Sequence, residues 1–224
     1  MELFDWRRRV ELPFVNRYEG LEFEVIGREK FEELAERLLS GSVTFGDLIR
    51  EFDQITPAQP RCPRIFISHR QVDYLFAERI AWLATQHGWD YWLDVHDPSL
   101  AAINAMKLPP PAQALAVALV IEVALLNCTH VLAAITDNSP GSAWIPYEYG
   151  RVKPRSIASQ LASCWHNPRA AVIPAEYMNL GPIFRDEMAI HQWLAAEKSR
   201  FLYCTRPTSK YRGGNAEEPE KLPE

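Results

Sequence analysis

The chain has 224 residues, of which 47% are hydrophobic and 24% are charged, values that exclude a chain disordered or fibrous throughout. Its formal net charge of −5 argues against a broad basic face for duplex nucleic acid. Residues 1–60 hold 8 Lys and Arg against 13 Asp and Glu, whereas the rest of the chain holds 16 of each. This uneven charge predicts a separate acidic segment at 1–60.

The cysteines and the apolar stretches favour a cytoplasmic protein. The four cysteines lie far apart without a CxxC pair, which argues against a zinc ribbon or a disulfide scaffold and favours a reducing compartment. The N-terminus lacks the apolar core of a signal peptide. The longest apolar stretch, 114–121, is too short to cross a bilayer, so we expect no membrane association.

Residues 28–54 show the spacing of two short helices. Apolar residues recur every three or four positions on both sides of Gly41 and Ser42, which break the pattern. Thr44 is placed to cap the second helix. The prolines that follow at 56–60 predict a linker, because proline cannot continue a helix.

From Arg64 onwards, short apolar strands alternate with helices. Strands are predicted at 65–67, 91–93, 131–135 and 171–173, and helices at 72–87, at 112–126, from about Trp144, and at 186–198. In the first helix the buried face should carry Val72, Phe76 and Ile80. This order is typical of an α/β domain with a flavodoxin-like parallel sheet covered by helices on both faces, here at 61–200. The tail at 201–224 is rich in Pro, Gly, Glu and Lys, which predicts disorder.

In such a sheet, ligands bind at the carboxyl ends of the strands, at the switch point between the first and third strands. Residues after the first strand should therefore face residues after the third, with residues after the second strand beside them. This crevice would offer one carboxylate, that of Glu148, together with a cation, several hydroxyls and an aromatic ring. The candidate substrate-binding residues around it are Ser68, His69, Arg70, Asp94, Asp97, Trp144 and Tyr147.

Six of these residues also have an ordinary structural role open to them. Glu148 could complement the dipole at the start of its helix, and Trp144 or Tyr147 could be core aromatics. Arg70 could form an ion pair with Asp73. Asp94 and Asp97 could cap the turns that follow them.

The sequence lacks the residue patterns of several other kinds of site. The histidines show no HxxxH or HExxH spacing, and there is no GxGxxG or GxxxxGK[ST], so we expect neither a metal nor a bound cofactor. Ser68 and His69 are neighbours on a strand end and point in opposite directions, which makes them a poor nucleophile and base pair. A phosphoacceptor receiver would want an acidic pair after the first strand, where this chain has Ser-His-Arg.

Three segments in order carry a more specific signal: RIFISHRQVD at 64–73, GWDYWLDVHDP at 88–98 and CTHVLAAITDNSPGSAWIPYEYG at 128–150. With them, residues 63–200 resemble a bacterial Toll/interleukin-1 receptor (TIR) domain. TIR domains open with a strand ending in Phe-Ile-Ser, and an Asp follows their second strand at the BB loop. Their third strand leads to a Ser-x-Trp and then to a Glu.

The resemblance implies an enzyme that cleaves NAD⁺. In enzymes of this family the glutamate four residues after the Trp is catalytic, which points to Glu148, and the loop after the first strand helps to bind the nucleotide, which points to His69 and Arg70. Cleavage of the nicotinamide–ribose bond would give nicotinamide with ADP-ribose or a cyclic ADP-ribose. NAD⁺ would be the substrate, and Trp144 would stack on it or shape the pocket.

The resemblance also implies a setting in bacterial antiphage immunity, with activity that depends on TIR–TIR self-association. The acidic segment at 1–60 could regulate that assembly, dock a partner or effector protein, or only cover the sheet. Because the family also contains adaptors, the alternative is a non-catalytic scaffold that acts through TIR–TIR contacts. A third reading is a base-exchange or deoxyribosyl-transfer enzyme acting on nucleosides.

Overall fold

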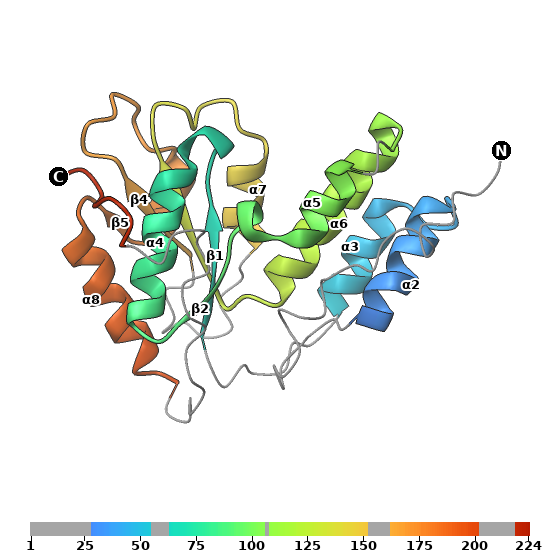
Figure 1. Cartoon of the computed structure of the whole chain (residues 1–224), viewed down its shortest axis with the longest axis horizontal. Coiled ribbons are helices and arrows are strands. Elements are labelled where there is room, and N and C mark those ends of the chain that lie inside the picture. Colours follow the sequence, from blue (N-terminus) through green and yellow to red (C-terminus); the bar gives the residue numbers. More distant parts are fainter. Residues whose placement is uncertain (1–27, 55–62, 106–107, 152–161, 202–217) are drawn as a thin grey trace. The chain divides into compact units, whose positions relative to one another are not determined.

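The computed structural model describes residues 28–54, 63–105, 108–151, 162–201 and 218–224 (Figure 1). The chain divides into two compact units, the first formed by residues 1–59 and 97–127 and the second by residues 60–96 and 128–224. Residues 97–127 lie inside the range that the sequence analysis gave to the α/β domain, but they group with the N-terminal residues. The predicted linker at 56–60 lies outside the described residues.

The second unit is built on a five-stranded parallel sheet with the order β2-β1-β3-β4-β5 (Figure 1). The strands are β1 (Arg64–Ser68), β2 (Asp90–Trp92), β3 (His130–Ile135), β4 (Ala162–His166) and β5 (Ile183–Phe184). This is the flavodoxin-like order, so the predicted fold class is confirmed. Because β1 lies between β2 and β3, the strand order reverses at β1, and the switch point lies between β1 and β3.

The side chains of the strands alternate between two apolar clusters, as the period of a strand requires. Ile65 and Ile67 belong to the cluster that holds residues of α4 (Tyr74–Gln86) and α8 (Glu187–Lys198). Ala133 and Ile135 belong to the cluster that holds residues of α7 (Trp144–Arg151). Ser68 is paired in register with Ala133, so its side chain lies on the face covered by α7.

The helix predicted at 72–87 consists of a short 3-10 turn, η2 (Gln71–Asp73), followed by α4. Gly88 ends it with a φ of +76°, a conformation that side chains with a Cβ disfavour. Ile80 is buried as predicted, whereas Val72 is 68% exposed because it lies in the 3-10 turn rather than in the helix. The prediction that Val72 faces the core is therefore wrong.

The strand predicted at 171–173 is also wrong. These residues have no partner in the sheet, and Ile173 is exposed. Val172 is held by side chains instead: its N–H donates to Asp137 Oδ1 (2.9 Å), and its carbonyl lies 2.8 Å from His166 Nε2. The fourth strand is β4, whose sequence ASCWH lacks the apolar run that marks a strand, and the fifth has only two residues.

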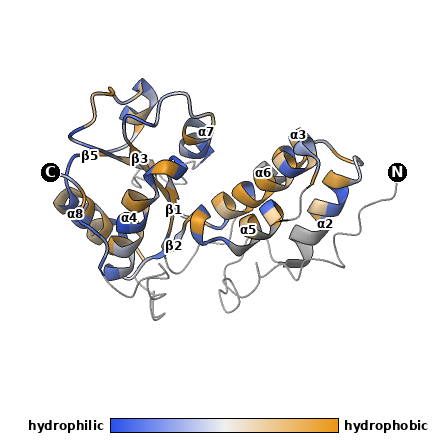
Figure 2. Ribbon diagram, turned by 45° about the horizontal axis from the view of Figure 1, so that its top comes forward, coloured by the Kyte–Doolittle hydropathy of each residue, from blue (hydrophilic) through white to orange (hydrophobic). Residues whose placement is uncertain are grey.

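The first unit holds α2 (Arg28–Leu39), α3 (Phe45–Gln54), α5 (Pro98–Ala105) and α6 (Pro110–Leu126). Thr44 caps α3 as predicted, since its Oγ1 accepts from the N–H of Asp47 at 3.2 Å. Figure 2 shows the apolar character of α6, which packs against α2 and α5 and is buried from Ala118 to Leu125. None of the helices in the described ranges is long and apolar enough to cross a membrane.

The last residues of the chain pack against the second unit. Arg79 of α4 forms ion pairs with Glu187 and Glu218, both at 2.7 Å, and Leu222 is buried. The N–H of Leu222 donates to Glu187 (2.7 Å). For residues 218–224 the structure therefore differs from the predicted disorder, while residues 202–217 lie outside the described ranges.

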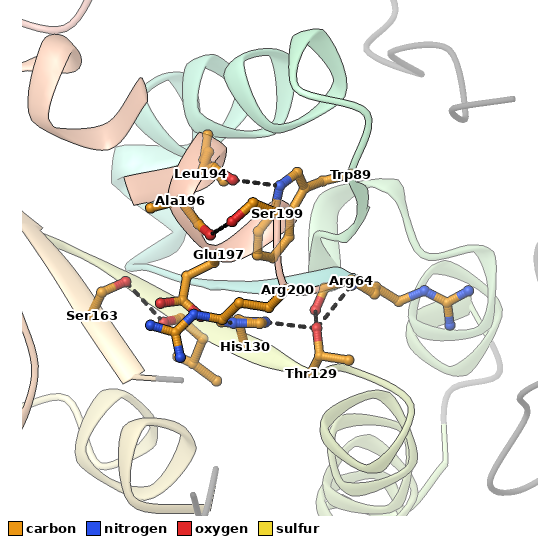
Figure 3. A network of polar contacts seen from close by, with 11 residues as sticks. Arg64, Trp89, Thr129, His130, Ser163, Leu194, Ala196, Glu197, Ser199 and Arg200 are labelled. Carbon is orange, nitrogen blue, oxygen red and sulfur yellow. Dashed lines mark hydrogen bonds and ion pairs between the residues drawn. The ribbon is translucent and has the colours of Figure 1, made fainter. Parts of the chain in front are cut away.

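A cluster of polar side chains lies at the amino end of β3, whereas the predicted site lies at the carboxyl ends of the strands (Figure 3). His130 is fully buried, with Nδ1 2.7 Å from Thr129 Oγ1 and Nε2 3.4 Å from Glu197 Oε2. The ring also packs edge-on against Trp89, with 4.7 Å between ring centroids. Burial lowers the pKa of His130, so this histidine contributes as a neutral core residue.

Candidate functional site

Glu148 and Ser68 meet at the switch point of the sheet. Glu148 is the fifth residue of α7 and is only 6% exposed. Ser68 ends β1, and its Oγ donates a 2.5 Å hydrogen bond to Glu148 Oε2. Two residues far apart in the sequence are thus brought together by the strand order and by the shared face of β1 and α7.

The surroundings of Glu148 raise the pKa of its carboxyl. Burial raises the pKa of its carboxyl to about 7; the hydrogen bond from Ser68 opposes this rise, and the charge of Asp94 adds to it. The carboxyl is therefore divided between its neutral and ionised forms near neutral pH. In the part of the chain that the structure describes, no backbone N–H donates to it, and it lies beyond the first turn of α7. Capping of its own helix is not its role.

His69 and Asp94 lie beside this pair. The imidazole of His69 is buried, and its Nε2 is 3.4 Å from Asp94 Oδ1 without the geometry of a hydrogen bond. Among the described residues this nitrogen has no hydrogen-bond partner. Asp94 begins the 3-10 turn η3 (Asp94–His96) and accepts from the N–H of Val95 at 2.7 Å, so it also caps that turn.

The loops after β1 and β3 are joined by Asp73. Its buried carboxylate accepts from Thr136 Oγ1 (2.7 Å) and from Asn138 Nδ2 (2.8 Å). The ion pair of Arg70 with Asp73, left open by the sequence, is not formed. Sequence reasoning gave Asp73 only the possible ion pair with Arg70 and did not name the link to Thr136 and Asn138, although an Asp, a Thr and an Asn close after adjacent parallel strands are a signal for such a link.

Trp144 and Tyr147 lie on α7, the helix that carries Glu148. Their rings are edge to face with 5.8 Å between centroids. Trp144 is 39% exposed, so it is not a core aromatic, and it lies one turn before Glu148 on the same helix face. Ser142 sets the start of this helix, since its Oγ accepts from the N–H of Ile145 at 3.2 Å.

Arg70 and Asp97 are two further residues predicted for the site. Arg70 is exposed, and within the described ranges its side chain makes no ion pair. Asp97 belongs to the first unit, where it is buried and its Oδ1 accepts from the N–H of Leu100 at 3.2 Å. It therefore caps the start of α5, and the structural role left open by the sequence applies to it.

Two other kinds of site have no basis in the described residues. No group of three or more His, Cys, Asp or Glu side chains there is arranged to hold a metal ion. Cys128 and Cys164 are free but buried, and burial raises the pKa of each thiol to about 12. Neither forms the thiolate that a nucleophile requires at neutral pH.

The arrangement suits the stabilisation of positive charge. It combines one buried carboxyl with a pKa near neutrality, a second carboxylate nearby and a hydroxyl that orients the first. A carboxylate in such a water-poor place interacts strongly with a cation that develops beside it. No protein-family model, curated protein or solved structure matches the chain, so this chemistry rests on the geometry itself.

Proposed function

We propose that the chain is a TIR-type NAD⁺ nucleosidase that cleaves the nicotinamide–ribose bond with Glu148 as its catalytic carboxylate. The observation that carries the proposal is the buried hydrogen bond between Ser68 and Glu148 at the switch point. It joins two of the segments on which the resemblance to TIR domains rests. Glu148 also keeps the spacing of four residues from Trp144 that this family's enzymes have.

The reaction asks little of the protein beyond a carboxylate. The C–N bond breaks with its electron pair going to the pyridinium nitrogen, so nicotinamide leaves as a neutral molecule and needs no general acid. Ordinary glycosides, by contrast, need a second carboxyl to protonate the leaving group. The ribose gains oxocarbenium character, which the ionised Glu148 stabilises. Water then adds to C1′ and loses a proton, giving ADP-ribose, or an internal nucleophile closes a cyclic product.

The remaining residues take roles around this centre. Ser68 orients the carboxylate, His69 offers its Nε2, which makes no hydrogen bond to the described residues, to a hydroxyl of the sugar, and the partly exposed Trp144 is assigned to stacking. Arg70, exposed in the loop after β1, is assigned to the pyrophosphate. Self-association through TIR–TIR contacts and a role in bacterial antiphage immunity belong to the same proposal.

The test is NAD⁺ consumption by the purified full chain at high concentration, with products resolved by liquid chromatography and mass spectrometry. Wild type should release nicotinamide, and Glu148→Gln should lose at least ~100-fold of that rate, as expected when a preorganised charge is removed. Glu176→Gln is the matched control, because Glu176 is an exposed carboxylate of the same unit. The mass of the second product separates hydrolysis from cyclisation.

A scaffold would behave differently in the same experiment. Wild type and Glu148→Gln would both leave NAD⁺ intact, even when the chain is fused to a dimerising domain that enforces self-association. That result would overturn the enzyme proposal. Equal nicotinamide release by wild type and Glu148→Gln would overturn the assignment of Glu148.

A further inference from the structure

The side chain of Asp73 is directed away from its own helix. Asp73 ends the 3-10 turn η2 directly before α4, and its backbone (φ −98°, ψ 17°) is not the extended form from which an Asp ordinarily caps a helix. Its side chain makes no capping hydrogen bond. Both carboxylate oxygens accept from the segment after β3 instead, Oδ2 from Thr136 Oγ1 and Oδ1 from Asn138 Nδ2.

The partners of Asp73 are themselves fixed in place. Thr136 is buried, and its Oγ1 also accepts from the N–H of Asn138 at 3.0 Å. The N–H of Thr136 donates to Ser139 Oγ at 2.9 Å. Each bond restrains the turn that leads from β3 towards α7. The link therefore joins a segment that begins five residues before Asp73, at Ser68, to a segment that ends at Glu148.

From this geometry we propose that Asp73 is a positioning residue, which holds the loops after β1 and β3 together and so sets the contact between Ser68 and Glu148. The inference rests on the proposed function for its catalytic meaning. The carboxylate does not serve the start of α4, since it makes no hydrogen bond to that helix. Functional groups that must be held closely are supported by contacts of this kind between neighbouring loops.

Two isosteric variants weaken the link without opening a cavity. Asp73→Asn removes the negative charge and leaves one acceptor oxygen for two donors, so that Thr136 Oγ1 must turn and accept from the new NH₂ group instead of donating. Thr136→Val removes the donating hydroxyl, and Thr136→Ser keeps it. Asp186→Asn is the control, because Asp186 is a carboxylate of the same unit that caps α8 by accepting from the N–H of Ala189 (2.7 Å).

Each full-length variant is measured in two ways. Steady-state kinetics with NAD⁺ should show kcat lowered by about 10-fold or more in Asp73→Asn and Thr136→Val, with KM within about 3-fold, because misplacement mainly affects the reacting geometry. Carboxyl ¹³C NMR should show the titration midpoint of Glu148 leaving its wild-type value of about 7 and falling by about one pH unit as the site loosens. Thr136→Ser and Asp186→Asn should keep both wild-type values.

The two measurements separate the possible failures. An unchanged Glu148 midpoint in both Asp73→Asn and Thr136→Val would overturn the positioning role, even if their melting temperatures fall. If the Glu148 midpoint shifted by the same amount in Asp186→Asn, the shift would reflect a general loss of stability, and this too would overturn the positioning role of Asp73. If wild type leaves NAD⁺ intact, the proposed function fails, while the NMR midpoint still decides the role of Asp73. If Asp73→Asn does not fold, the comparison of Thr136→Val with Thr136→Ser decides it.

Discussion

Glu148→Gln should make the protein more stable at alkaline pH while it removes activity. The pKa of Glu148 is raised from 4.5 to about 7 because burial disfavours the carboxylate. Below pH 4.5 both the folded and the unfolded chain carry the proton, so this group adds no pH dependence. Between pH 4.5 and 7 the unfolded chain loses the proton first, and the folded state of the wild type loses stability as pH rises.

The size of the effect follows from the same shift. At 1.36 kcal/mol per pKa unit, a rise from 4.5 to about 7 corresponds to up to about 3 kcal/mol of wild-type stability lost above pH 7. Glutamine has nearly the same shape, keeps an oxygen that accepts from Ser68 and carries no charge. The free energy of unfolding of Glu148→Gln should therefore exceed that of wild type at pH 8 and approach it at pH 5.

Urea unfolding at pH 5, 6, 7 and 8, followed by the fluorescence of buried tryptophans such as Trp165, gives both curves. Glu187→Gln is a control of opposite sign. Burial disfavours the charge of Glu187, but hydrogen bonds from Arg79 and from the N–H of Leu222 outweigh it and lower its pKa. That variant should lose stability at pH 8. If Glu148→Gln were no more stable than wild type at pH 8, the reasoning about a costly buried carboxylate would be refuted.

Three further predictions concern the fold. The pKa of His130 is lowered in the folded state, so the unfolded chain takes up a proton first as pH falls below about 6.5, and wild type should lose stability there. In urea unfolding between pH 7.5 and 5.5, His130→Gln should show a smaller decline in the free energy of unfolding than wild type. An equal decline in the two proteins would contradict the prediction. Truncation after residue 217 removes the buried side chain of Leu222 and should lower the free energy of unfolding by about 2 kcal/mol or more. An unchanged melting temperature would show that residues 218–224 do not stabilise the second unit. Asp97→Ala removes the cap of α5 and should cost about 1 kcal/mol in denaturant unfolding, with Asp97→Asn closer to wild type.

Much of the fold was predictable because its elements carry strong local patterns. β1 and β3 are short apolar runs followed by polar residues, and the end of α4 is marked by Gly88. The switch-point rule then predicted from the strand order that Ser68 and Glu148 lie on the same edge of the sheet, and their hydrogen bond agrees with it. Thr44 was found because threonine directly before a helical pattern is a residue type preferred at the N-cap.

The failures have physical causes that a single sequence does not display. β4 is buried by its neighbours although its sequence, ASCWH, mixes small, polar and aromatic residues, so no apolar run marks it, while 171–173 has the run but no strand beside it. Val72 fits helical spacing but lies in a 3-10 turn, where the period differs. The link from Asp73 to Thr136 depends on the distance between two loops, which tertiary structure sets. The grouping of 97–127 with the N-terminal helices is tertiary in the same sense.

The stability cost of Glu148 and its proposed reactivity have one origin. Burial removes the water that would stabilise the carboxylate, which is why its pKa lies near 7, and the same loss of water strengthens its attraction for a cation. The charge of Asp94 also has two effects. In the free protein it disfavours ionisation of Glu148, and with NAD⁺ bound it adds to the negative potential at the positively charged nicotinamide ring and ribose. A pyridinium nucleotide in the site should therefore lower the pKa of Glu148, whereas a neutral nucleoside should not. The rate of nicotinamide release should accordingly rise with pH up to about 7 at low NAD⁺ and become less dependent on pH as the site fills.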